Sequence, residues 1–337
     1  MPGGSGNVVA MIAVFGAGAI GCWVGGKLAA SGADVTLIGR PRIVDQLTRG
    51  LVISDFEGGE VRCAPQLAIT PSAAEKASLV LVTVKSAQTA EAASALAGVI
   101  AKTAVVVSLQ NGIRNAEVLR AGLPGNRVLA AMVPFNVTRR GEAFHRASGG
   151  ILRVDADPAN AELLAACARA ALPIEARSDM PAVQWAKLVM NLNNAINALS
   201  GLPLATELAD RGFRRCLAAA QREALALLAR ANQPVAKLTA IPPRWMPRLL
   251  GLPDAVFTRL ARKVVAIDPH ARSSMWDDFE AKRPTEIDYL QGEVVALAHR
   301  LGGAAPINGK LVELVRAAET GGKRDFTAPQ LQAALGI

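Results

Sequence analysis

The segment "MIAVFGAGAIGCWVGGKLAASG" (residues 11–32) is the strongest indication of the fold, because its pattern predicts a strand, a glycine-rich turn and a helix in succession. The turn has the spacing G-x-G-x-x-G. The first glycine permits the tight bend, the second lets the backbone approach a pyrophosphate, and the third lets helix and strand pack closely. The helix N-terminus adds free N–H groups for phosphate. We therefore predict a dinucleotide site at the turn, with a purely structural turn as the alternative; its residues are Gly16, Gly18, Ala19, Ile20 and Gly21.

The next predicted strand, residues 34–39, leads into Gly39-Arg40-Pro41-Arg42. An NAD enzyme places Asp or Glu here to hold the ribose 2′-hydroxyl, whereas an arginine can hold a 2′-phosphate with two hydrogen bonds. Arg40 therefore favours NADP over NAD. The alternative is that Arg40 and Arg42 are solvated loop charges.

Strand and helix patterns then alternate, which is typical of an α/β fold with a doubly wound, mostly parallel sheet. We expect strands at 51–54, 67–69, 79–85, 104–110 and 127–133, and helices at 87–100 and 114–121. Ligands bind such sheets at the carboxyl ends of the strands. Lys85 and Asn111 follow two of these strands and are candidate site residues, with an edge charge and a simple turn as the alternatives. Asn136, in a segment (132–138) that would continue the sheet, is a weaker candidate.

The second half of the chain reads as helical. Strand patterns fade near residues 175–181, and helical patterns cover 181–200, 206–232, 254–265, 270–281 and 286–301. We therefore expect a flexible lead-in (1–10), a dinucleotide-binding domain (11–178) and an all-α domain (179–325).

The first of these helices carries the unusual segment "WAKLVMNLNNAINALS" (185–200). At about 100° per residue, Lys187, Asn191 and Asn194 form one polar stripe, and Asn193 and Asn197 form a second. Asparagine is a poor helix former and buried lysine is costly, so the stripes need a reason. Three hypotheses remain open: a wall of a substrate site, a solvated helix face, or a hydrogen-bonded seam between helices.

A second polar segment covers residues 272–294. Thr285 and Asp288 have the spacing of a helix capping box, in which Thr285 caps and Asp288 reaches back. This leaves Glu286 without a structural role. Ser274 is either a helix hydroxyl or a ligand for a carboxylate.

Composition excludes several classes of protein. The chain has 337 residues, of which 51% are hydrophobic and 19% charged, so it is globular. Its net charge of +9 comes from dispersed arginines without a nucleic-acid-binding module, and its apolar runs are too short to span a membrane. The N-terminus lacks a signal peptide pattern. Four widely spaced cysteines predict reduced thiols in a cytoplasmic protein without a structural metal, and His145, His270 and His299 receive no chemical role.

Together these motifs resemble the ketopantoate reductase (2-dehydropantoate 2-reductase) family. The resemblance spans about residues 11–318 and excludes the uninformative residues 319–337. It rests on GAGAIG (16–21), Arg40, Lys85 in TVKSAQ, Asn111 in QNG, Lys187 and Asn191 in WAKLVMN, and the segment from Ser274 to Asp288.

The resemblance implies a Rossmann domain followed by an all-helical domain, with the active site in the cleft between them. It also implies NADPH-dependent reduction of a 2-oxo acid, which in this family gives pantoate for pantothenate biosynthesis. Lys187 would be the catalytic lysine and Glu286 would complete the site. Asn111 and Asn191 would contact substrate or cofactor, Ser274 the substrate carboxylate, and Arg40 and Lys85 the cofactor. A homodimer remains open.

One position departs from the family pattern. Family members that reduce ketopantoate carry an asparagine eight residues after the lysine, where this chain has Ala195, with Asn194 one residue earlier. The departure concerns the identity of the substrate and barely affects the type of reaction. Three alternatives to ketopantoate reduction remain: reduction of another 2-oxo acid, a related dehydrogenase of a sugar phosphate or hydroxy acid, and a redox sensor that binds NADP without catalysis.

Overall fold

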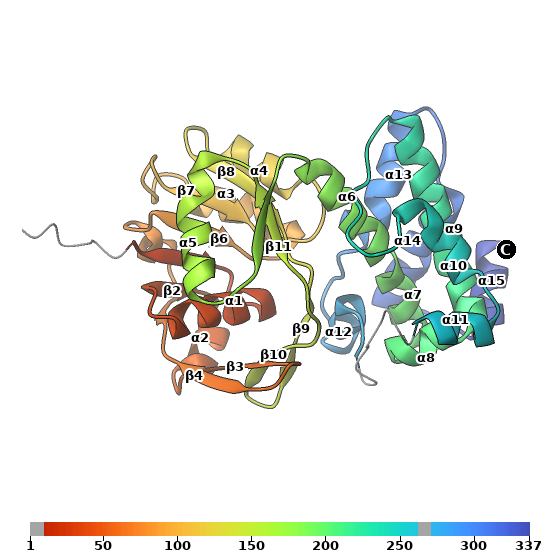
Figure 1. The fold of residues 1–337 in the computed structure, drawn as a ribbon, viewed down its shortest axis with the longest axis horizontal. Coiled ribbons are helices and arrows are strands. Elements are labelled where there is room, and N and C mark those ends of the chain that lie inside the picture. Colours follow the sequence, from red (N-terminus) through yellow and green to blue (C-terminus); the bar gives the residue numbers. More distant parts are fainter. Residues whose placement is uncertain (1–9, 262–270) are drawn as a thin grey trace, which may run out of the picture. The chain divides into compact units, whose positions relative to one another are not determined.

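The computed structural model describes residues 10–261 and 271–337 (Figure 1). All of the expected lead-in except residue 10 lies outside the described residues. The chain divides into two compact units, residues 1–180 and 181–337. The first is an α/β unit, and the described residues of the second form helices and connecting loops. The predicted fold class, a Rossmann-like α/β part followed by an all-α part, is therefore confirmed.

An eight-stranded sheet forms the centre of the first unit (Figure 1). Its order is β12 (Ile174–Arg177), β11 (Leu152–Asp155), β8 (Arg127–Met132), β7 (Val105–Ser108), β6 (Leu79–Val82), β1 (Ile12–Phe15), β2 (Val35–Ile38) and β5 (Gln66–Ala68). The strands from β8 to β5 are parallel, whereas β11 pairs with β8 in the antiparallel direction. The carboxyl ends of the parallel strands therefore share one edge.

Helices cover both faces of this sheet, because alternate side chains of a strand point to opposite faces. Ile12 and Val14 of β1 belong to a core shared with α1 (Ala19–Ala30) and α5 (Ala161–Arg169). Ala13 belongs to the opposite core, shared with α3 (Thr89–Leu96) and α4 (Asn115–Gly122). Helix α2 (Pro41–Leu47) follows β2, and the short 3-10 helices of this unit are η1 (Pro71–Ala74), η2 (Ser86–Gln88) and η3 (Pro158–Asn160).

A second sheet was not expected. It has the order β4 (Glu60–Cys63), β3 (Leu51–Asp55), β10 (Ala143–Arg146) and β9 (Val137–Arg140). The predictions that 51–54 belongs to the main sheet and that 132–138 continues it are wrong, since β3 and β9 lie in this second sheet.

Helix α1 explains the second sheet, because it is apolar on both sides and must be covered twice. A Cβ added at Gly25 would lie 2.6 Å from Leu37 of the main sheet, and one added at Gly26 would lie 2.8 Å from Ile53 of the second.

The second unit packs around the long helix α9 (Arg211–Arg230), which contacts α7, α8, α10, α13, α14 and α15. The described helices are α6 (Met180–Asn191), α7 (Asn193–Ser200), α8 (Leu204–Ala209), α10 (Met246–Leu250), α11 (Asp254–Ala261), α12 (Ser274–Glu280), α13 (Gln291–Arg300), α14 (Pro306–Glu319) and α15 (Ala328–Leu335), with η4 (Pro243–Trp245) and η5 (Ile287–Tyr289) between them. Helix α15 lies beyond residue 325, where the expected domain ended.

Two predicted helices are each divided in two. The helix predicted at 181–200 is interrupted at Leu192. The helix predicted at 206–232 is divided at Asp210, whose carboxylate accepts a hydrogen bond from the N–H of Gly212 (2.6 Å) and so starts α9 afresh. Residues 262–265 and His270, which fall in two other predicted helices, lie outside the described residues.

Candidate active site

The glycine-rich turn between β1 and α1 requires glycine at two of its three positions. Gly16 has a φ of +120°, and a Cβ there would lie 2.7 Å from the backbone nitrogen of Val84. A Cβ at Gly21 would lie 2.1 Å from the carbonyl oxygen of Gly16. Both glycines therefore permit close packing of the turn against the end of β6.

Gly18 differs from its two neighbours in the motif. It is exposed, directly precedes α1, and a Cβ added to it would meet nothing within 4 Å. The first turn of α1 contains no acidic residue, and Ala19 and Ile20 are partly exposed. A helix N-terminus carries unsatisfied N–H groups and partial positive charge, so this open surface suits a pyrophosphate.

Arg40 lies at the carboxyl end of β2 and directly precedes α2. Arg40 and Arg42 are both exposed, and neither guanidinium contacts a carboxylate within the described residues. Both are therefore available to an anionic group beyond the end of β2.

A buried polar network joins the loops that follow β6 and β7. The hydroxyl of Ser86 donates to the carbonyl oxygen of Asn111 (2.9 Å), and the Asn115 amide donates to the same oxygen. The hydroxyl of Thr89 donates to Asn115 Oδ1 (2.8 Å) and accepts from the amide of Gln110 (2.7 Å). The network fixes the backbone of Asn111 against the loop that carries Lys85.

Three of these residues, Ser86, Thr89 and Asn115, were not singled out from the sequence. Ser86 and Thr89 follow Lys85 closely, and Asn115 follows Asn111, so polar residues cluster after both strand ends. That clustering was the available indication. Lys85 and Asn111 themselves are partly buried and make contacts of their own.

Lys187 lies on α6 and is partly buried. Burial disfavours the charged ammonium and lowers the pKa of Lys187 from 10.5 to about 8. A lysine with a pKa near neutrality can hold a proton and release it under ordinary conditions, which is what a general acid requires.

The two predicted asparagine stripes have different environments. Asn193 and Asn197 are buried, and their amides donate to Glu207 Oε2 at 3.4 Å and 2.7 Å. The seam hypothesis therefore holds for this second stripe.

The first stripe is more accessible. Asn191 and Asn194 are partly exposed, and the Asn194 side chain makes no hydrogen bond within the described residues. Ala195, by contrast, is fully buried. The break at Leu192 means that the angular relation of Asn194 to Lys187, estimated for one continuous helix, applies only approximately. The N–H of Leu192 still donates to Leu188 O, so the break is mild.

The structure assigns the cap of α12 to Ser273, whose hydroxyl accepts from the N–H of Trp276 (3.2 Å). Ser274 is exposed at the first position of α12 and is not the cap.

The predicted capping box at Thr285 and Asp288 is wrong. The hydroxyl of Thr285 accepts from the N–H of Ile287 (3.3 Å), but the backbone N–H of Thr285 donates to Glu319 (2.7 Å) and Asp288 pairs with Arg316 (2.6 Å), so Asp288 does not reach back to Thr285. Glu286 is partly buried and directly precedes η5.

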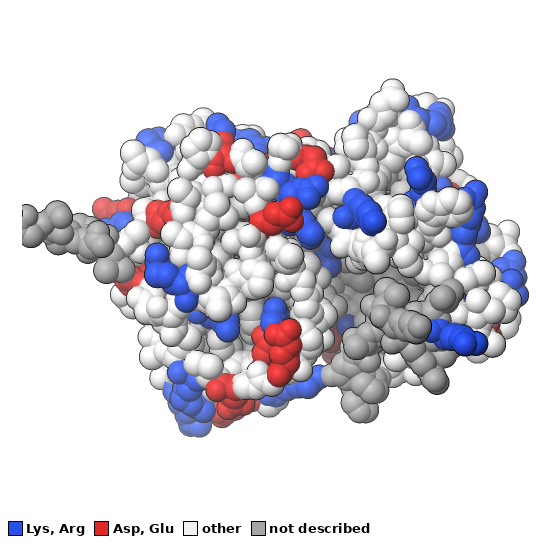
Figure 2. Space-filling model, in the orientation of Figure 1, with Lys and Arg blue, Asp and Glu red and all other residues white. Residues whose placement is uncertain are grey.

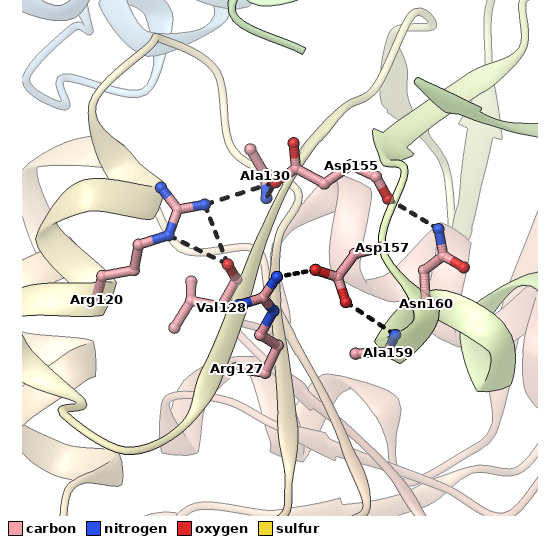
Figure 3. A network of polar contacts seen from close by, with 8 residues as sticks. All are labelled: Arg120, Arg127, Val128, Ala130, Asp155, Asp157, Ala159 and Asn160. Atoms are coloured by element: carbon pink, nitrogen blue, oxygen red, sulfur yellow. Dashed lines mark hydrogen bonds and ion pairs between the residues drawn. The ribbon is translucent and has the colours of Figure 1, made fainter. Parts of the chain in front are cut away.

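A cavity of about 380 Å³ opens at a different place in the first unit. Its charged side chains pair with each other: Arg127 contacts Asp157, and Arg120 lies 3.5 Å from Asp155 (Figure 3). It lies at the amino end of β8, whereas ligands of such sheets bind at the carboxyl ends. We therefore do not assign it to the candidate site.

The remaining surface and thiol groups give little indication of other chemistry. Over the first unit, Figure 2 shows acidic and basic side chains interspersed on the visible face.

The four cysteines are free thiols, and burial raises the pKa of Cys22, Cys167 and Cys216 to about 12. In the described ranges, no helix is long and apolar enough to cross a membrane, and no group of three His, Cys, Asp or Glu residues could hold a metal ion.

Comparison with known proteins covers both units. The family model described as Ketopantoate reductase PanE/ApbA matches residues 12–156, and its C-terminal counterpart matches residues 179–319. A 2-dehydropantoate 2-reductase of Halobacterium salinarum is 30% identical over 322 residues, which cover 92% of this chain and 99% of that protein.

Among solved structures, a PanE/ApbA family ketopantoate reductase from Ralstonia eutropha JMP134 is similar with a TM-score of 0.78 and 30% identity, covering 92% of this chain and 99% of that one. A ternary structure of D-mandelate dehydrogenase with NADH and anilino(oxo)acetate has a TM-score of 0.75 and 20% identity, covering 92% and 99%. The second likeness concerns the fold alone.

Proposed function

The chain belongs to the ketopantoate reductase PanE/ApbA family and is an oxidoreductase, and from this premise we propose that it reduces a 2-oxo acid to a 2-hydroxy acid with NADPH. The first candidate substrate is 2-dehydropantoate, the substrate in the name of the Halobacterium salinarum relative. The observation that carries the proposal is Lys187, with its pKa of about 8, one helical turn from Asn191.

The cofactor half of the proposal rests on the first unit. The open space at Gly18 and the acid-free N-terminus of α1 fit a pyrophosphate. Exposed Arg40 and Arg42 suit a 2′-phosphate because a guanidinium can make two charge-assisted hydrogen bonds to it. When bound, NADPH supplies the hydride.

The substrate half rests on the second unit. Negative charge develops on the ketone oxygen during reduction, and the Lys187 ammonium stabilises that charge and delivers a proton to the oxygen. Asn191 and Asn194 orient substrate oxygen atoms without changing the charge of the site. Ser274 binds the substrate carboxylate, and Glu286 accepts a hydrogen bond from a substrate hydroxyl. Asn111 and Lys85 contact the cofactor from the edge of the sheet.

A different 2-oxo acid is the second candidate. It is favoured by Ala195, which is buried at the position where the resemblance to ketopantoate reductases implies an asparagine. A substrate without a hydroxyl at that point would not need the missing amide.

The test is product identification. The purified chain is incubated with NADPH and each member of a panel of 2-oxo acids, ketopantoate included, and products are separated by chromatography against authentic 2-hydroxy acids. Formation of pantoate supports the first candidate, and formation of another 2-hydroxy acid alone supports the second. Failure of every panel member, with NADPH bound, contradicts the proposal and favours the redox-sensor alternative.

A further inference from the structure

Asn197 joins three segments of the second unit. Its amide nitrogen donates to Glu207 Oε2 (2.7 Å) on α8 and to the carbonyl oxygen of Leu202 (2.9 Å). Its amide oxygen accepts from the backbone N–H of Ser273 (2.9 Å). Asn197 is fully buried, and its hydrogen bonds to Glu207 and Ser273 are shielded from water.

Ser273 carries the connection onward to residues assigned to the substrate. Its hydroxyl accepts from the N–H of Trp276 and so begins α12, whose first residue is Ser274. The same hydroxyl donates to the backbone oxygen of Asn194 (3.2 Å). A continuous series of hydrogen bonds therefore runs from Glu207 through Asn197 to the backbone that holds Ser274 and Asn194.

Glu207 is the unusual member of this series. It is fully buried, and in the described part of the chain its carboxyl group pairs with amides and with no cation. Burial raises the pKa of Glu207 to about 8, so the group is mostly uncharged at neutral pH. Its oxygen Oε2 accepts the amide hydrogen bonds of Asn193 and Asn197 and so acts as a fixed anchor, and glutamine has a similar shape with an amide oxygen that can accept in the same way.

We propose that Glu207 is a positioning residue for the substrate: through Asn197 and Ser273 it holds Ser274 and Asn194 in the geometry that binds a 2-oxo acid. The inference rests on the proposed function of those two residues. Glu207 itself contacts neither substrate nor cofactor.

The expected result is a change in substrate affinity that glutamine prevents. Glu207→Ala should raise KM for the 2-oxo acid roughly 10-fold, the scale of one lost buried hydrogen bond, and leave the Kd for NADPH unchanged. Glu207→Gln should keep KM within about twofold of the unmodified chain, because its amide oxygen still accepts from Asn197. In a Ser274→Ala background, Glu207→Ala should add less than its effect alone, since coupled residues are not additive.

A matched control separates positioning from general stability. Asn308 is also fully buried and bonded to a glutamate, Glu223, but it connects α14 to α9. Asn308→Ala should lower Tm without raising KM. If Glu207→Ala does not fold, Ser273→Ala tests the last link of the series, because it removes the hydroxyl that joins Asn194 to α12, and an unchanged KM in that variant would overturn the inference.

A readout without substrate distinguishes failure of this inference from failure of the proposed function. Hydrogen exchange of the first turn of α12 should quicken in Glu207→Ala and not in Glu207→Gln, whether or not any 2-oxo acid is reduced. Unchanged exchange there would overturn the inference even in an inactive protein. In an active protein, a lower Tm with KM unchanged would also overturn it.

Discussion

The hydroxyl of Thr83 donates a 2.6 Å hydrogen bond to the carbonyl oxygen of Gly16, and so ties the end of β6 to the glycine-rich turn. A Cβ at Gly21 would lie 2.5 Å from the same hydroxyl. Small residues therefore hold together three parts of the proposed cofactor site: the glycine-rich turn, the start of α1 and the segment that leads to Lys85. Gly18 remains outside this packing.

Gly18→Ala should weaken NADPH binding without lowering stability. The added methyl meets no protein atom, and the φ of −80° suits alanine, but it occupies the space proposed for the pyrophosphate. We expect the Kd for NADPH to rise at least about tenfold, the scale of one or two lost hydrogen bonds to the backbone. Fluorescence titration and a melting curve give both values.

Gly309→Ala is the matched control, since it also adds a methyl where there is room, but on α14. It should leave the Kd for NADPH unchanged and keep or slightly raise Tm, because alanine favours a helix interior more than glycine does. An unaltered Kd in Gly18→Ala would contradict the placement of the pyrophosphate.

Arg40→Ala should weaken NADPH binding by about 1–3 kcal/mol and leave NADH binding nearly unchanged, because only NADPH carries the 2′-phosphate. Isothermal titration with both cofactors measures the difference. Equal affinity of the unmodified chain for the two cofactors would refute the assignment of Arg40.

Asn194→Ala should affect catalysis, whereas Asn193→Ala should affect stability. Asn194 is partly exposed without a hydrogen-bonding partner in the described residues, so its loss should lower kcat/KM and leave Tm unchanged. Asn193 is buried against Glu207, so its loss should lower Tm instead. Kinetics with ketopantoate and a bulkier 2-oxo acid, together with melting curves, separate the two. A silent Asn194→Ala, with the bulkier acid preferred, would remove Asn194 from the site.

The two asparagine stripes of residues 185–200 show how far the sequence could predict the site. Helical spacing separated the two polar stripes, but it could not decide which faced a ligand. Asn197 donates to Glu207 on another helix, and it accepts from Ser273, which lies 76 residues away. Such contacts depend on tertiary packing, which local periodicity does not contain.

The fold shows the same division. The strand, turn and helix of residues 12–30 were predictable because local spacing and glycine geometry determine them. The second sheet was not, because β10 pairs with β3 across about 90 residues and most side chains of β4 are exposed. The divided helix at Leu192 escaped prediction because no proline or glycine marks the break.

Replacing Glu207 should also change how stability depends on pH. Its folded pKa of about 8 lies above its ordinary value of 4.5, so its favourable contribution is complete below pH 4.5 and is lost as the pH rises toward 8. Relative to Glu207→Gln, the unmodified chain should lose stability between about pH 5 and 8. Parallel Tm curves for the two proteins over that range would show that Glu207 does not titrate there.

The Lys187 ammonium should set the alkaline limit of activity. Because its pKa is lowered to about 8, the protonated form that acts as the acid is depleted above that pH. We expect kcat to be level below pH 8 and to fall up to about tenfold per unit above it. The profile is measured in Glu207→Gln as well, to exclude the second group that titrates near pH 8. A level profile up to pH 10 would contradict this assignment.

The most direct test of the account is the NADPH-dependent turnover of the preferred 2-oxo acid by Lys187→Ala, compared with the unmodified chain at pH 7. If Lys187 is the general acid, kcat should fall roughly 10²–10⁴-fold, the usual range for a lost general acid, while the variant keeps its Tm and its Kd for NADPH. Near-normal turnover by a folded, NADPH-bound Lys187→Ala would contradict the account, and would assign the lysine to the packing of α6 alone.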